Sequence, residues 1–140
     1  MTIQPISSSA SYTADRSWLA GMHGTDSTET ITCDITKFTK DVHYQASTDS
    51  TQPYSRLLSG VPVGRVTASG LFGPYDPAAA DGRQVLAGLI FAETLFAPTQ
   101  TKVAAALLWH GTVRTAKVPG GGIDPSKIVP SAAAAQIRFV

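Results

Sequence analysis

Hydrophobic and polar side chains alternate along several short stretches of the chain, which predicts β-strands rather than helices. The clearest case is Thr30–Phe38. There Ile31, Cys33 and Ile35 share one face, and threonine and aspartate occupy the other, as in a half-buried strand. Further strands are predicted, in chain order, over Val61–Ala68, Gln84–Phe91, Val103–His110, Thr112–Val118 and Gln136–Val140.

Glycine, proline and aspartate mark the breaks between these strands. Gly111 separates two of the predicted strands and indicates a tight turn or a bulge. Asp124 followed by Pro125 is typical of a helix start, with the aspartate as N-cap and the proline at the first helical position. We expect a short helix in two pieces over residues 125–135, interrupted at Pro130. The predicted fold class is therefore mainly β with a short helix (α+β).

Residues 1–29 show neither the helical nor the strand repeat of apolar residues, and they are predicted to form an extended N-terminal arm. A disordered tail seldom carries Trp and Tyr, so we expect the arm to order against a partner, for instance by adding a strand to a sheet edge. The alternative is that the arm packs on its own domain. Residues 30–53 are then a strand and a polar connection, and residues 54–140 form a compact β-rich core. The arm residues expected to contact the partner are Ile3, Pro5, Ile6, Tyr12, Trp18 and Leu19.

The composition describes a weakly charged surface. Charged residues make up 15% of the chain and the formal net charge is +1, whereas about 25% charged residues is usual. Coverage by other subunits explains this composition, and so does a monomer whose surface is solvated by Ser and Thr. The 11 basic residues are scattered, while nucleic-acid binding needs them gathered on one face. We therefore expect no nucleic-acid partner.

Other features of the sequence suggest where the protein is made. No apolar run is long enough to span a membrane, so no membrane partner is expected. The first ten residues lack the charged and apolar regions of a signal peptide. Cys33 is the single cysteine, which excludes an intramolecular disulfide and fits a reducing cytoplasm.

Residue types used in catalysis and metal binding are present, but not in the patterns that such sites need. Asp76 and Asp81 each neighbour Pro or Gly, as turn residues do. The three histidines and Cys33 lack the spacing of metal ligands. Residues 120–127 contain glycines and a lysine, but not in the order of a phosphate loop. We therefore predict no enzyme activity, no metal and no cofactor; a small hydrolase that uses Ser and His is the alternative.

The order of several motifs resembles the head decoration proteins of tailed bacteriophages, the family of the phage lambda capsid-stabilising protein, in the versions carried by phages of actinobacteria. Over residues 54–140 the motifs are a G-R-V-T strand within Val63–Gly70, a loop over Gly73–Arg83, A-G-L-I-F at Ala87–Phe91, a strand pair around A-A-L-L-W-H-G-T-V, and a C-terminal I-R-F-V.

This resemblance implies a structural protein without enzyme activity. Family members form homotrimers that bind the outer surface of the expanded head at three-fold and quasi-three-fold positions and stabilise it against the pressure of the packaged DNA. The partner would be the major capsid protein, contacted through the N-terminal arm, and the Gly73–Asp81 loop would lie near a subunit contact. The protein would be made in the host cytoplasm and reside on the virion. The other function considered is a virion-surface binding module for a peptide or glycan.

Overall fold

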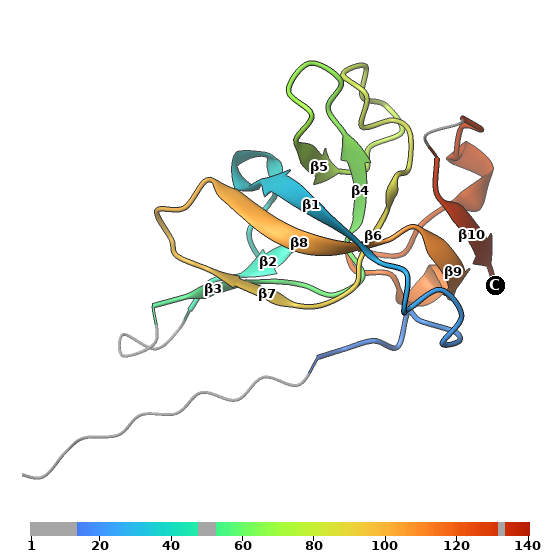
Figure 1. Cartoon of the computed structure of the whole chain (residues 1–140), viewed down its shortest axis with the longest axis horizontal. Helices are drawn as coiled ribbons and strands as arrows, with labels where there is room; N and C mark the ends of the chain where they lie inside the picture. Colours follow the sequence, from blue (N-terminus) through green and yellow to red (C-terminus); the bar gives the residue numbers. More distant parts are fainter. Residues whose placement is uncertain (1–13, 48–52, 132–133) are drawn as a thin grey trace, which may run out of the picture.

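The computed structural model describes residues 14–47, 53–131 and 134–140, and its centre is a closed five-stranded β-barrel (Figure 1). The order around the barrel is β1-β5-β4-β6-β8, and β8 pairs with β1 to close it. β1 and β5 pair in parallel; the other neighbours pair antiparallel. The barrel strands are β1 (Glu29–Asp34), β4 (Pro62–Arg65), β5 (Phe72–Pro74), β6 (Gly88–Ile90) and β8 (Lys102–Leu108).

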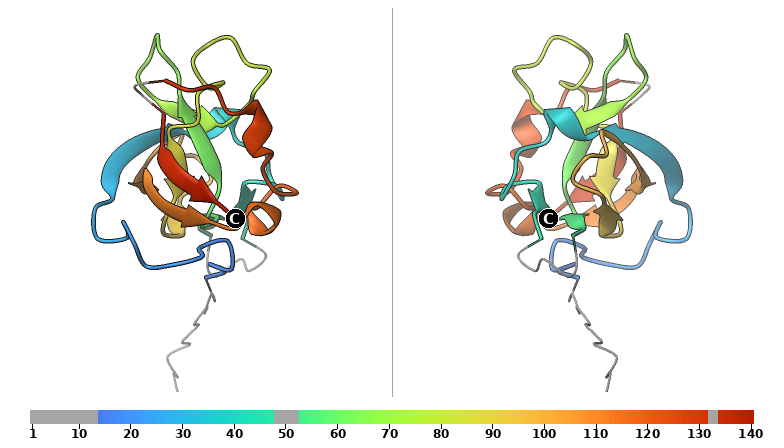
Figure 2. Two further views of the ribbon diagram at one scale, coloured as in Figure 1. Left: turned by 90° about the vertical axis from the view of Figure 1, so that its right-hand side faces the viewer. Right: turned by 90° about the vertical axis from the view of Figure 1, so that its left-hand side faces the viewer.

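Two small sheets flank the barrel on opposite sides in Figure 1. One has the order β2-β3-β7 and is antiparallel; the other is the parallel pair of β9 and β10, which Figure 2 shows from its own side. Their strands are β2 (Tyr44–Gln45), β3 (Ser55–Leu57), β7 (Thr94–Phe96), β9 (His110–Val113) and β10 (Gln136–Phe139). Three single 3₁₀ turns are described: η1 (Ile35–Lys37), η2 (Thr115–Lys117) and η3 (Pro125–Lys127). The described chain is therefore mainly β, as predicted.

The barrel interior is the first of two hydrophobic cores. The alternation predicted for β1 is confirmed, because Ile31 and Cys33 are buried while their neighbours Thr30 and Thr32 are exposed. β8 alternates in the same way, and its pairing sets Ile31 opposite Ala105, another buried residue. A shift of one residue would turn these side chains to the other face, so the shared burial fixes the register of β1 on β8.

β6 and β8 form a wall between this core and a second one. Ile90 and Leu107 are partners across the two strands, and both are buried in the barrel. Leu89 and Leu108 are the adjacent pair, and both belong to the second core, with Trp18, Val113 and Val118. Successive side chains of a strand point to opposite faces, so these two strands are apolar on both faces.

The N-terminal part of the chain fills the second core. The side chain of Trp18 is only 1% exposed. Its Nε1 donates to Ser59 Oγ at 3.1 Å, and that hydroxyl donates to the Phe91 carbonyl at 2.7 Å. Gly60, in a left-handed conformation (φ +91°), leaves room for the indole, since a Cβ there would lie 2.5 Å from the Trp18 ring. Around Trp18 the chain thus packs on its own domain, the alternative that the sequence left open.

Several predicted elements are shorter than expected. Of Val61–Ala68 only Pro62–Arg65 is strand, of Gln84–Phe91 only Gly88–Ile90, and the strand predicted over Thr112–Val118 ends at Val113, before the 3₁₀ turn η2. The strand predicted over Thr30–Phe38 ends at Asp34, whose carboxylate accepts a hydrogen bond from the Thr36 amide at 3.1 Å and starts η1. Among the described residues of 125–135, only the 3₁₀ turn η3 is helical. Asp124 is its N-cap, as predicted, and accepts from the Ser126 amide at 3.0 Å. In residues 128–131 and 134–135 no helix follows the turn, and Pro130 has no amide hydrogen to continue one.

The prediction of a turn or bulge at Gly111 was wrong. The break between β8 and β9 falls at Trp109, and Gly111 lies within β9. A Cβ at this glycine would lie 3.0 Å from the carbonyl oxygen of His23. Gly111 therefore marks a place where a second backbone approaches the strand closely.

Replacing the buried indole should destabilise the domain. We expect Trp18→Ala to lower the free energy of unfolding by about 3–5 kcal/mol, because it leaves a cavity in the second core. Urea unfolding measures the change. Met22→Ala is the matched control, since Met22 is 76% exposed and its replacement should stay within about 0.5 kcal/mol. A loss below about 1 kcal/mol for Trp18→Ala would show that the indole does not anchor this segment.

Candidate functional site

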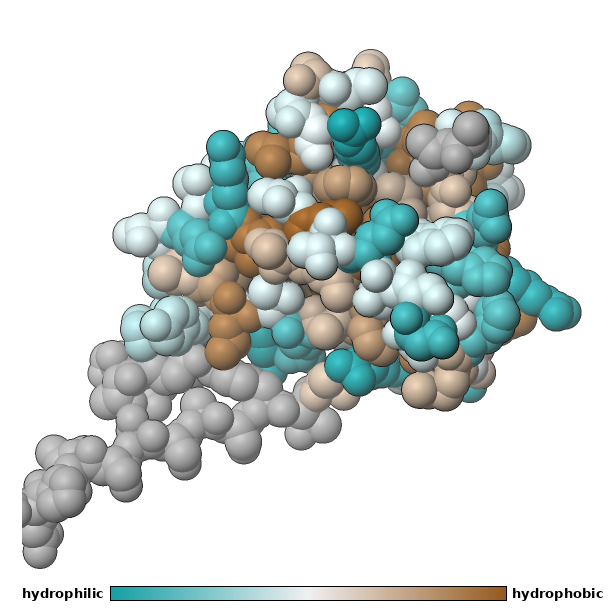
Figure 3. All heavy atoms as spheres, viewed as in Figure 1, coloured by the Kyte–Doolittle hydropathy of each residue, from teal (hydrophilic) through white to brown (hydrophobic). Residues whose placement is uncertain are grey.

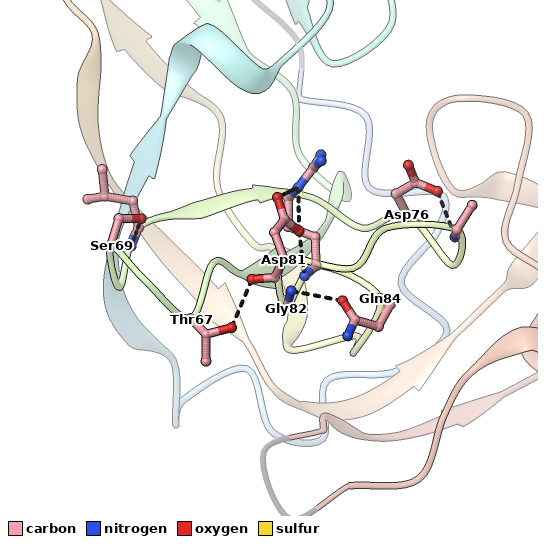
Figure 4. Close-up of polar contacts among 9 residues, drawn as sticks. Thr67, Ser69, Asp76, Asp81, Gly82 and Gln84 are labelled. Atoms are coloured by element: carbon pink, nitrogen blue, oxygen red, sulfur yellow. Dashed lines mark hydrogen bonds and ion pairs between the residues drawn. The ribbon is translucent and has the colours of Figure 1, made fainter.

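Two loops meet at one end of the barrel and form a candidate contact surface. Residues 66–71 join β4 to β5, and residues 75–87 join β5 to β6. We call these two loops together the loop platform. Their tips are joined through Thr67, whose amide and hydroxyl both donate to the Asp81 carbonyl, at 2.9 and 2.8 Å (Figure 4). The loops therefore support each other.

The two aspartates of the longer loop close its turns, as the sequence predicted. Asp81 Oδ1 accepts from the Arg83 amide at 3.2 Å, and Oδ2 pairs with the Arg83 guanidinium at 3.0 Å. Asp76 Oδ1 accepts from the Ala78 amide at 2.9 Å. The bond from the Arg83 amide is the main reason that the pKa of Asp81 lies below its ordinary value. Both carboxylates thus have structural hydrogen bonds inside the loop.

The outer surface of the loop platform is small and mostly uncharged. Thr67, Ala68, Ser69, Pro77, Ala78 and Ala80 are exposed. On the face drawn in Figure 3, hydrophilic residues (teal) lie in several groups between more hydrophobic ones rather than in one patch. A firmly held surface of small residues can approach another protein closely, which suits the predicted position near a subunit contact.

The sequence-predicted arm residues divide into two groups. Ile3, Pro5, Ile6 and Tyr12 lie outside the described residues. Trp18 is buried and Leu19 is half-buried. Because the Trp18 side chain lies inside the domain, it is not on a surface that a partner contacts in this conformation. An aromatic residue in a polar segment indicates burial, but the sequence does not say in which molecule.

We call residues 14–20 the strap; they reach the side of β9 that does not pair with β10, and Trp18–Ala20 bond to it there. Leu19 forms an antiparallel bridge with Val113. The Ala20 amide donates to the Thr112 carbonyl at 3.0 Å, and the Arg114 amide donates to the Trp18 carbonyl at 2.7 Å. β9 is thus paired with β10 on one side and with the strap on the other.

Side chains reinforce this attachment. Arg114 Nη1 donates to the carbonyls of Ser17 at 3.0 Å and Leu19 at 2.9 Å. The guanidinium carbon of Arg16 lies 4.8 Å from the centre of the Phe91 ring, a cation–π contact. Sequence reasoning missed Arg114, since a single exposed arginine after a strand carries no recognisable pattern. The strap lies at the opposite end of the molecule from the loop platform (Figures 1 and 2).

The histidines and the cysteine have packing contacts. Cys33 is fully buried in the first core, and burial raises the pKa of its thiol to about 12. His43 Nδ1 accepts from the Thr39 amide at 2.9 Å, and burial lowers the pKa of this imidazole. His23 and His110 meet edge to face, with ring centres 4.6 Å apart. These surroundings suit structural side chains.

Within residues 14–47, 53–131 and 134–140, no group of three or more His, Cys, Asp and Glu side chains is arranged to hold a metal ion. In the same part of the chain, no helix has the length and hydrophobicity needed to cross a bilayer.

Comparison with known proteins identifies the family. The model of the bacteriophage lambda head decoration protein D family matches residues 25–136. The match extends over most of the chain, and the chain belongs to this family. No curated protein matches the sequence.

Family membership gives the general role of the chain. The family consists of structural proteins of the phage head and is not an enzyme family. The chain is therefore a capsid decoration protein, and its place is on the virion capsid. The matched range begins at residue 25, before β1, whereas the resemblance seen in the sequence began at residue 54. The family match includes β1 because β1 is one of the five strands of the barrel.

The buried thiol provides a simple test of the first core. We expect Cys33 in the folded protein to resist an aromatic disulfide reagent at about pH 8, because it is inaccessible and stays protonated until far higher pH. Release of the coloured thiolate measures the reaction, and the same protein in concentrated urea should react completely. Rapid stoichiometric reaction of the folded protein would contradict this placement of Cys33.

A side chain at Gly82 should destabilise the loop platform. Gly82 has a φ of +116°, and a Cβ there would lie 2.3 Å from the Arg65 carbonyl oxygen. Gly121 also has a positive φ, +93°, but its Cβ would meet no atom within 4 Å. We expect Gly121→Ala to cost about 1–2 kcal/mol of stability from backbone strain alone, and Gly82→Ala to cost more because of the clash. Urea unfolding compares the two; equal losses would show that the loops separate easily.

Proposed function

We propose that this chain is a cementing protein of a phage head. Homotrimers bind the outer surface of the expanded shell at three-fold and quasi-three-fold positions and stabilise it against the internal pressure of the DNA. The N-terminal arm contacts the major capsid protein. The observation that carries this proposal is the family match over residues 25–136.

The composition supports association with other subunits. Charged residues are only 15% of the chain, and a weakly charged surface is poor at keeping a small domain dispersed. Contact with neighbouring copies and with the shell would cover much of this surface. The small exposed residues of the loop platform are compatible with such close contacts.

The described structure refines which arm residues make the contact. Trp18 is held in the second core, so the contact residues proposed for the capsid are those before the strap: Ile3, Pro5, Ile6 and Tyr12. Strand addition would supply backbone hydrogen bonds, and the spaced apolar side chains would supply specificity.

The proposed mechanism is multivalent. Three arms on one trimer need only modest individual affinities, because binding of the first arm raises the effective concentration of the other two. The trimer would then hold adjacent capsid subunits together through several weak contacts, and it would dissociate only when all of them open.

Deletion of residues 2–13 tests the role of the arm. We expect the truncated protein to keep the unfolding free energy and the trimeric mass of the full chain, since the strap and both cores remain. We expect it to lose at least tenfold in affinity for undecorated, expanded heads, because all three arm contacts of the trimer disappear. Sedimentation of heads with bound protein measures affinity, and analytical ultracentrifugation measures the mass.

The deletion must stop before the strap, because a deletion that removes Trp18 would damage the second core and confuse the result. Full occupancy of heads by the truncated protein would overturn the proposed role of the arm. A monomeric full chain that binds a surface glycan or peptide but not expanded heads would instead support the binding-module alternative.

A further inference from the structure

We infer that the strap, residues 14–20, fixes the point at which the arm leaves the domain, and that Arg114 and Trp18 are positioning residues for capsid binding. This inference rests on the proposed function of the arm. It differs from that function in assigning a role to described residues that need not touch the capsid.

The strap is fastened to the domain by contacts on three sides. Its backbone pairs with β9 through the Ala20 and Arg114 amides. Its centre is held by the Trp18 indole in the second core. Its outer side is held by the Arg114 guanidinium, which bridges the carbonyls on both sides of Trp18.

These contacts are more than filling of the core requires. A tryptophan could fill the second core without a guanidinium bonded to the two neighbouring carbonyls. Bonds from a charged donor are stronger than neutral ones, and here they restrain the backbone on each side of the anchor. The strap therefore fixes the path of the backbone from Ser17 onward, a few residues after the end of the arm.

A fixed exit point shortens the tether between the arm and the rigid domain. With the strap fastened, the tether is the 16 residues before Ser17, the first residue whose carbonyl Arg114 holds. With the strap released, the tether would extend over the 22 residues before His23, which packs on His110. Effective concentration falls roughly as the −3/2 power of tether length. Lengthening the tether from 16 to about 22 residues therefore weakens each linked contact about 1.6-fold, and the two linked contacts of a trimer together about 2.6-fold; lengthening it to about 28 residues weakens the two together about fivefold.

Two matched insertions separate this inference from a purely structural role of the strap. A flexible Gly-Ser segment of about 12 residues is inserted at one of two positions: between Thr13 and Ala14, or between Ala20 and Gly21. Both chains are otherwise full length. The second position is suitable because the Gly21 Cβ would meet no atom within 4 Å. Both insertions lengthen the covalent path from the arm to β1 equally, but only the first lies between the arm and the strap.

We expect the first insertion to weaken binding to undecorated, expanded heads about fivefold, and the second to leave it unchanged. Hydrogen exchange at the Ala20 and Arg114 amides shows whether the strap stays fastened in each protein. Adding Arg114→Gln to the second insertion should speed this exchange and lower head affinity towards that of the first insertion. Arg138→Gln, which removes an exposed cation from β10, is the control for the loss of charge.

The outcomes distinguish the inference from the function on which it rests. If deletion of residues 2–13 abolishes head binding but the two insertions weaken it equally, the strap does not set the tether and the inference is overturned. It is also overturned if Arg114→Gln leaves the exchange of the Ala20 amide unchanged. If the deletion leaves head binding intact, the proposed function of the arm fails, and this inference fails with it.

Discussion

The structure depends on a pair of adjacent strands that are apolar on both faces. β6 and β8 set Ile90 against Leu107 on the side of the barrel, and Leu89 against Leu108 on the opposite side. Neither face can be left in water, because each of these side chains stabilises the fold by about 1.5–3 kcal/mol when it is buried. The barrel covers one face. The other must be covered by chain from outside the barrel.

The strap, β9 and β10 supply that cover. Trp18 of the strap and Val113 of β9 are buried in the second core, and Ile137 and Phe139 of β10 pack against it. This explains why the domain needs the residues before β1, although the barrel closes without them. It also explains why the strap is held firmly: its anchor fills the core that β6 and β8 require. The strap is therefore held in place by the fold itself.

Sequence patterns predicted the long elements well and the short ones poorly. Six consecutive pairs join β1 to β8, and a ladder of that length leaves a visible period of two. β2, β3, β5 and β7 contain only two or three residues each, too few for any period, and they were missed. The helix predicted after Asp124 depended on a genuine N-cap, but capping starts a turn without deciding its length. Trp18 was predicted to contact a partner, whereas its location in its own domain depends on Ser59 and Gly60, which no local pattern connects to it.

The two ends of the molecule have surfaces of different kinds. At one end the chain passes from the arm into the strap, and at the other the loop platform presents small side chains on loops joined through Thr67 and Asp81. Because these ends face away from each other, a flat shell that contacts the strap end does not also contact the loop platform. If the strap end faces the capsid, the loop platform is left for a neighbouring copy or for the outside of the virion. The residues that give the sequence its family character, Gly73–Asp81, and the residues proposed to bind the shell are then different parts of the protein, connected through the shared wall of β6 and β8.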